Sequence, residues 1–251
     1  MKTGIYATAL LLLASLHLQA ADIMVFAAAS LTNALTEIKQ SYEAQSSNKI
    51  LFNFGASGTL GRQVQEGAPA DLFISADEAR VDALEKLNLL ENATRLNLLS
   101  NTLVVVVPID DKVAFTSIQD LAAPRFKRVA LSDPQLVPVG TYSKQYLTQL
   151  NLWDAINDRL VFTDNVRATL AAVEAGNADA GMVYRTDALI SKRVRIAWSV
   201  PLEEGPKILY PFVVVKACKN PEGARDFLQY LQSPSACTIF EKQGFLVLTK
   251  P

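Results

Sequence analysis

Short apolar runs alternate with stretches of helical periodicity along almost the whole chain. Apolar residues three and four positions apart predict buried helix faces, and unbroken apolar runs predict buried strands. Their alternation indicates an α/β protein with mostly parallel sheets. The predicted strands are 24–28, 50–54, 71–75, 103–107, 128–131, 180–184, 194–198 and 210–215. The predicted helices carry inward residues at Leu31, Leu35, Ile38 and Tyr42 and at Val81, Leu84 and Leu87, or span 142–150, 166–174, 222–231 and 234–243.

Two long apolar strands, 103–107 and 212–215, bracket the middle of the chain. Without repeats or a Pro/Gly-rich linker, the pattern disfavours separate modules on a string. The two strands could be paired crossings between two lobes, with a ligand between the lobes at the carboxyl ends of strands. The expected division is a signal peptide at 1–20, lobe 1 at 21–104 and 211–251, and lobe 2 at 105–210.

Two strand-turn-helix units near the N-terminus have the shape of an anion site. Ser30 and Ser57 each lie where a strand passes through a small-residue turn into a helix, and Gly55 and Gly58 let the backbone approach a ligand. The first N–H groups of a helix, the positive end of its dipole and a hydroxyl together bind an oxyanion. The alternative is that both serines are plain N-caps.

The N-terminus predicts export. Lys2, an apolar stretch at 5–16 and a small residue at Ala20 are typical of a secretory signal peptide cut after Ala20. The apolar stretch is too short for a permanent membrane span, and no cysteine lies at the cut to carry a lipid. We therefore expect a periplasmic protein without direct membrane insertion.

Charge and composition exclude several functions. Cleavage would leave 23 basic and 25 acidic residues, so neither nucleic acid nor an anionic membrane is an expected partner. The single histidine, His17, lies in the signal peptide, which removes the usual general base and histidine metal sites from the mature chain. Cys218 and Cys237 share an oxidising compartment, and their positions leave open whether they form a disulfide.

Four ordered motifs resemble the periplasmic molybdate-binding proteins of ABC importers. They are Phe-Ala-Ala-Ala-Ser-Leu-Thr-Asn-Ala at 26–34, Gly-Ala-Pro-Ala-Asp-Leu-Phe-Ile-Ser-Ala-Asp at 67–77, Asp-Pro-Gln-Leu-Val-Pro-Val-Gly at 133–140 and Gly-Met-Val-Tyr at 181–184. The resemblance implies a two-lobed periplasmic-binding-protein fold of type II, with two crossing strands and the ligand in the interlobe cleft. It also implies a monomer that is not an enzyme and delivers its ligand to a membrane permease.

The resemblance also implies the ligand and its binding residues. Molybdate and tungstate are dianions without a proton at neutral pH, so their site should offer only hydrogen-bond donors, and no cofactor is expected. The implied contacts are the hydroxyls of Ser30, Ser57 and Tyr184 and the backbone near Val139 and Val166.

Other interpretations stay open. A receptor for sulfate or another small tetrahedral oxyanion is the nearest alternative, and Tyr184 could be a packing residue. A secreted serine hydrolase is a remote alternative, because 46–49 matches Ser-x-x-Lys but no histidine supports it. The charged residues expected outside the site, on the surface or as caps, are Arg62, Asp164, Arg167, Asp187, Glu203 and Glu204.

Overall fold

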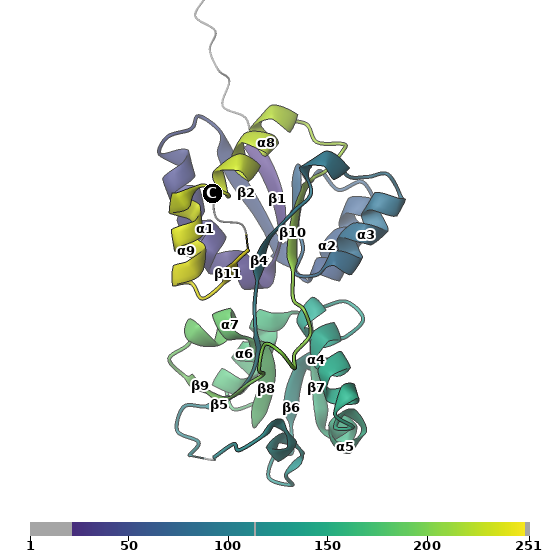
Figure 1. Cartoon of the computed structure of the whole chain (residues 1–251), viewed down its shortest axis with the longest axis vertical. Helices are drawn as coiled ribbons and strands as arrows, with labels where there is room; N and C mark the ends of the chain where they lie inside the picture. Colours follow the sequence, from purple (N-terminus) through teal and green to yellow (C-terminus); the bar gives the residue numbers. More distant parts are fainter. Residues whose placement is uncertain (1–21, 113, 249–251) are drawn as a thin grey trace, which may run out of the picture.

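The computed structural model describes residues 22–112 and 114–248, which form two lobes, each built on one sheet (Figure 1). The predicted signal peptide lies outside the described residues. Lobe 1 holds a six-stranded sheet in the order β11 (Leu246–Val247), β4 (Leu96–Ser100), β10 (Tyr210–Val214), β3 (Leu72–Ile74), β1 (Asp22–Ala28) and β2 (Lys49–Gly55). Lobe 2 holds a five-stranded sheet in the order β7 (Leu160–Thr163), β6 (Val129–Ser132), β8 (Ala180–Tyr184), β5 (Leu103–Pro108) and β9 (Val194–Ser199).

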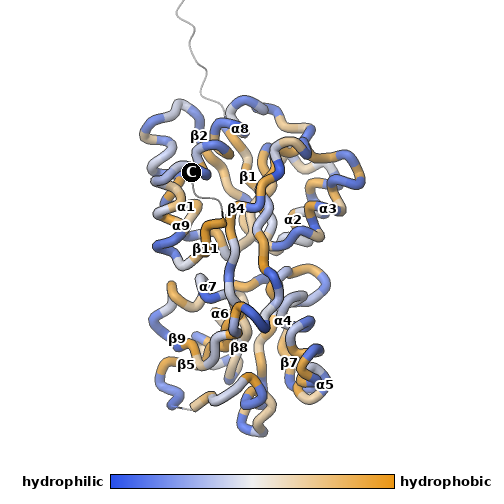
Figure 2. The backbone as a smooth tube through the Cα atoms, in the orientation of Figure 1, coloured by the Kyte–Doolittle hydropathy of each residue, from blue (hydrophilic) through white to orange (hydrophobic). Residues whose placement is uncertain are grey.

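Helices cover both sheets. Those of lobe 1 are η1 (Ala29–Leu31), α1 (Thr32–Glu43), α2 (Ser57–Gln65), α3 (Glu78–Lys86), η2 (Asn92–Thr94), α8 (Pro221–Tyr230) and α9 (Pro234–Lys242). Those of lobe 2 are η3 (Ile118–Ala122), α4 (Pro138–Gln149), α5 (Trp153–Ile156), η4 (Asn157–Arg159), α6 (Val166–Glu174) and α7 (Arg185–Leu189). Figure 2 shows the apolar segments gathered in the strands inside each lobe and the polar ones in the outer loops.

The two-lobed α/β architecture confirms the predicted fold, but both sheets are mixed rather than mostly parallel. In lobe 1, β2, β1 and β3 run parallel, whereas β10, β4 and β11 pair antiparallel. In lobe 2, β7, β6 and β8 run parallel, and β5 pairs antiparallel with β8 and β9. The antiparallel strands arise because the chain leaves lobe 1 after β4 and returns through β10.

The idea that the strands 103–107 and 212–215 pair as crossings is wrong. The first lies in the lobe 2 sheet as β5, and the second lies in and just after β10 in the lobe 1 sheet. Their unbroken apolar sequences reflect burial inside each lobe. The chain instead crosses at 101–102, between β4 and β5, and at 200–209, between β9 and β10.

Most of the predicted elements are present. The inward face of α1 is confirmed by the burial of Leu35, Ile38 and Tyr42. Leu87 is 51% exposed because α3 ends at Lys86, so its predicted inward position is wrong. Strands β4 and β7 were not expected from the sequence.

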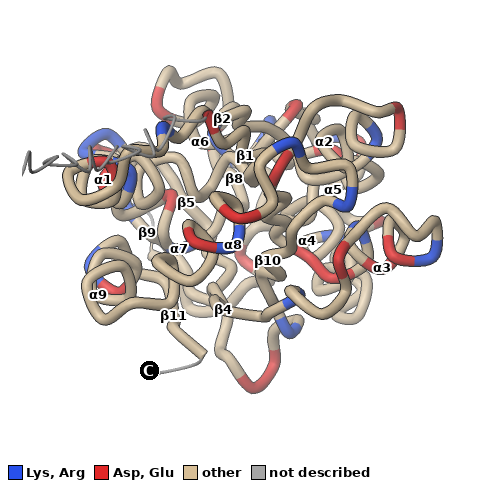
Figure 3. Tube along the Cα trace, turned by 90° about the horizontal axis from the view of Figure 1, so that it is seen from above, with Lys and Arg blue, Asp and Glu red and all other residues tan. Residues whose placement is uncertain are grey.

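Three further observations bear on localisation and redox state. Cys218 and Cys237 are both free thiols, and burial raises the pKa of Cys218 to about 12. Within 22–112 and 114–248, no helix has the length and apolarity needed to cross a membrane. Acidic and basic residues are interspersed over the molecule (Figure 3), consistent with its small net charge.

Candidate functional site

The parallel strands of both lobes point their carboxyl ends at the seam between the lobes. In lobe 1, β1 leads into η1 and α1, and β2 leads into α2; in lobe 2, α4 follows β6, and α6 follows β7. The starts of four helices therefore converge on one place. Because the first N–H groups of a helix lack partners within it, this arrangement concentrates hydrogen-bond donors.

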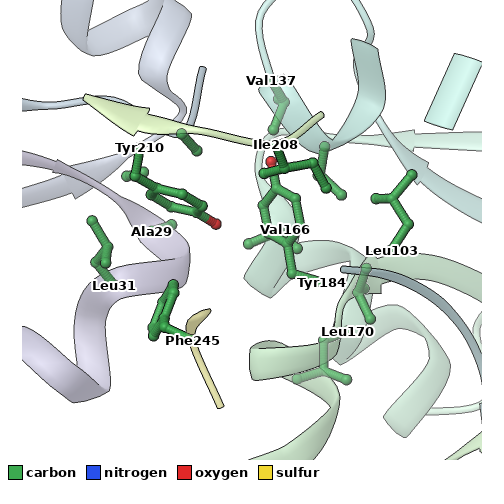
Figure 4. Packing of buried hydrophobic residues seen from close by; sticks show 14 of the residues in the cluster. Ala29, Leu31, Leu103, Val137, Val166, Leu170, Tyr184, Ile208, Tyr210 and Phe245 are labelled. Atoms are coloured by element: carbon green, nitrogen blue, oxygen red, sulfur yellow. The ribbon is translucent and has the colours of Figure 1, made fainter. Parts of the chain in front are cut away.

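A small cavity, about 10 Å³ in volume, lies at this convergence. No side chain among its described lining residues is acidic or basic. Figure 4 shows Ala29 and Tyr210 on the lobe 1 side, opposite Tyr184, Val166 and Val137 of lobe 2. All five residues predicted to contact the ligand line the cavity: Ser30, Ser57, Val139, Val166 and Tyr184.

Ser57 is held so that its hydroxyl proton is available to a ligand. It is the first residue of α2, fully buried, and makes no capping bond to its own helix, so the N-cap alternative is wrong. Its Oγ instead accepts the backbone N–H of Ala76 at 3.0 Å. Because this N–H can only donate, the Ser57 hydroxyl keeps its own proton for another acceptor.

Ser30 is connected by hydrogen bonds to Tyr210 and Asn101. Its Oγ is 3.1 Å from the Tyr210 hydroxyl and makes no capping bond to η1. The Tyr210 hydroxyl in turn accepts Asn101 Nδ2 at 3.2 Å. Either hydroxyl can donate in the Ser30–Tyr210 bond; when Tyr210 donates, the Ser30 proton is free for a ligand. Sequence analysis missed Tyr210 and Asn101, since neither lies in a recognisable motif.

The helix starts of lobe 2 supply backbone donors. The side chain of Asn165 accepts the amides of Arg167 and Ala168, while its carbonyl accepts that of Thr169. The amide of Val166, the first residue of α6, is therefore the one left without an intrahelical partner. In α4, Pro138 occupies the first turn and has no N–H, and the helix has no side-chain cap, so Val139 carries the first free amide.

Tyr184 brings a buried hydroxyl to the cavity wall. Its ring is 1% exposed, yet its hydroxyl has no hydrogen-bond partner among the described residues. Burial raises the pKa of this hydroxyl well above its usual value, so it remains a donor at neutral pH. A buried hydroxyl without a partner costs about 1–3 kcal/mol. An acceptor placed in the cavity would remove that cost.

A charged pair lies directly behind the cavity wall. Arg167 Nε is 2.6 Å from Asp187 Oδ1, and Arg167 Nη2 donates to the Ser30 carbonyl of lobe 1 at 3.2 Å. Asp187 is fully buried, so its expected place on the surface is wrong: α7 packs on α6, and Arg167 supplies the countercharge. Burial raises the pKa of Asp187 to about 7, although Arg167 opposes that rise.

The hydrolase alternative has no geometry to support it. Ser46 lies on a separate groove of lobe 1 and accepts the amide of Asn48, while Lys49 pairs with Glu43 at 3.6 Å. Within the described ranges, no cluster of three or more His, Cys, Asp or Glu side chains is placed to hold a metal ion.

The chain is similar in sequence to known proteins. The chain is 39% identical to the molybdate-binding protein ModA of Escherichia coli over 234 residues, covering 90% of this chain and 89% of that protein. It is 41% identical to a putative ABC transporter substrate-binding lipoprotein of Bacillus subtilis over 224 residues, covering 89% and 85%.

Two solved structures have a fold similar to that of this chain. The substrate-binding domain of a putative molybdenum ABC transporter from Clostridium difficile is 36% identical, with a TM-score of 0.71 and coverage of 92% of this chain and 100% of that one. The periplasmic molybdate-binding protein of Azotobacter vinelandii, at 23% identity and covering 90% and 100%, supports the fold with a TM-score of 0.83. The family model described as bacterial extracellular solute-binding protein matches residues 23–246, and the chain belongs to that family.

Proposed function

We propose that this protein captures molybdate or tungstate in the interlobe cavity and delivers it to the membrane permease of an ABC importer. The observation that carries the proposal is the buried Tyr184 hydroxyl without a partner, in a cavity lined by donors. The names of the Escherichia coli and Clostridium difficile relatives support this ligand class. Members of the family are transport components rather than enzymes.

The electrostatics of the cavity suit an unprotonated dianion. Ser30, Ser57 and Tyr184 offer hydroxyl protons, and the starts of α2, α4 and α6 offer amides. Each hydrogen bond to a charged group stabilises binding by about 1.5–3 kcal/mol, so several together offset the desolvation of the anion. When Asp187 is ionised, the Arg167–Asp187 pair is neutral as a unit, and the donors and helix dipoles then hold the charge of the anion.

The same proposal includes the cellular setting. The protein acts in the periplasm as a monomer after removal of its N-terminal signal peptide, and it requires no cofactor. Its partners are the oxyanion and the permease, with no nucleic acid and no direct membrane insertion.

Titration calorimetry of the mature chain with four anions tests the proposal. Molybdate and tungstate should bind at one site per chain, and phosphate should not compete at comparable concentrations, because its proton would face donors only. Phosphate displacing molybdate would contradict the donor-only site. Sulfate displacing molybdate at comparable concentrations would instead identify a sulfate receptor.

A further inference from the structure

Hydrogen bonds join the two lobes at two places along the seam. At one, the Gly58 amide donates to the Leu136 carbonyl at 2.9 Å, and Arg80 Nη2 donates to the Gln135 carbonyl at 2.8 Å. At the other, Arg167 of lobe 2 donates to the Ser30 carbonyl of lobe 1. The Gly58–Leu136 bond lies next to the lining residues Ser57 and Val137, whereas the Arg167 bond reaches a lining residue, Ser30, directly.

Arg167 is connected to both halves of the cavity. It directly follows Val166, whose amide is a proposed ligand contact, and its own amide is capped by Asn165. Its guanidinium crosses the seam to the carbonyl of Ser30, the residue whose hydroxyl faces the cavity. A change in the position of this guanidinium would therefore affect a ligand contact in each lobe.

The position of Arg167 is fixed from within lobe 2. Asp187, on α7, holds Nε at 2.6 Å and is itself fully buried. Since both residues belong to lobe 2, their ion pair needs no contact between the lobes. The bond to Ser30, in contrast, exists only when the lobes are closed.

We propose that Arg167 is a positioning residue that latches the closed lobes around the anion and so slows its release. This inference rests on the proposed function. The anion first meets the open protein, where the latch is absent, and leaves only after the closed form reopens, when the bond to Ser30 must break. The latch therefore acts on the dissociation rate constant, koff, and leaves the association rate constant, kon, nearly unchanged.

A simple attraction between Arg167 and the anion would give a different result. Asp187 neutralises Arg167, so the pair adds little net charge at the cavity, and its loss should not slow association. If Arg167 acted by attraction, its removal would lower kon and weaken the dependence of kon on salt.

Stopped-flow tryptophan fluorescence with molybdate at pH 8, where Asp187 is ionised, separates these cases. Arg167→Ala should raise koff about ten- to hundredfold, the effect of losing one charge-assisted hydrogen bond, with kon within about twofold of the parent value. Arg167→Lys keeps the charge but lacks the fork that reaches two partners, so it should give an intermediate koff. Arg193→Ala is the control: Arg193 is exposed just before β9, and its loss should change neither constant.

A second variant separates loss of the latch from loss of folding. Arg167→Ala leaves Asp187 buried without its countercharge, which destabilises a protein. Arg167→Met with Asp187→Asn removes both charges and should also raise koff. An unchanged koff in the folded variants, or a fall in kon alone, overturns the latch. Absence of molybdate binding by the parent protein overturns the proposed function instead.

Discussion

Replacing Tyr184 by Phe should affect binding and folding in opposite directions. The substitution removes only the hydroxyl, which is buried and has no protein partner in the closed structure. In the complex, the same hydroxyl donates to the dianion, and a hydrogen bond to a charged acceptor contributes about 1.5–3 kcal/mol. Tyr184→Phe should therefore raise the Kd for molybdate about ten- to hundredfold.

The free protein should not lose stability. Tyr184→Phe removes no hydrogen bond within the protein, and a hydroxyl buried without a partner costs about 1–3 kcal/mol. Ring packing is retained, including the contact of Tyr184 with Tyr210 at 5.9 Å between ring centroids. The free energy of unfolding of the ligand-free variant should equal or exceed that of the parent.

Calorimetry and denaturant unfolding, with and without molybdate, measure both quantities. A bound ligand stabilises only the native state, so the ligand-induced rise in melting temperature should shrink in the variant. Tyr230→Phe is the matched control, because Tyr230 packs against Tyr42 in lobe 1, away from the cavity. Undiminished molybdate affinity in a well-folded Tyr184→Phe protein would refute the donor role of this hydroxyl.

Four further outcomes are expected. Ser30→Ala and Ser57→Ala should each raise the Kd for molybdate about tenfold or more in calorimetry, and unchanged affinity in both would place the site elsewhere. Gly58→Ala should hinder closure of the lobes, because a Cβ there would lie 2.4 Å from the Leu136 carbonyl oxygen. In small-angle scattering with saturating molybdate, the variant should have a larger radius of gyration than the parent. Equal radii would contradict this. Molybdate should shrink the parent protein in the same experiment, and an unchanged profile would count against lobe closure. The pKa of Asp187 is about 7 in the folded protein and ordinarily 3.8, so between these pH values the folded state binds a proton that the unfolded state has lost. The free energy of unfolding should therefore fall as pH rises from about 4 to 7. Asp187→Asn should remove this pH dependence in denaturant titrations.

Sequence periodicity predicted the parts of the fold that repeat a simple pattern. The apolar spacing of α1 and the unbroken run of β5 identify these elements, because burial on one face or on both leaves a direct trace in the sequence. The strands β4 and β7 were missed because polar residues interrupt the first and β7 has half-exposed residues at a sheet edge.

The cavity was predictable only in part. The positions after strands indicate Ser30 and Ser57, and the resemblance adds Val139, Val166 and Tyr184. The pairing of Arg167 with Asp187 left no local signal, since the two lie on different helices and each alone resembles a surface charge.

The position of β10 has a consequence for the order in which the two lobes fold. In the lobe 1 sheet, β10 lies between β3 and β4, which do not pair with each other. Lobe 2 comes from one continuous stretch of chain, whereas the lobe 1 sheet stays in two pieces until the C-terminal part arrives. Closing so long a loop is entropically costly and slow. When the chain emerges N-terminus first, lobe 2 can therefore finish folding before lobe 1 acquires its central strand.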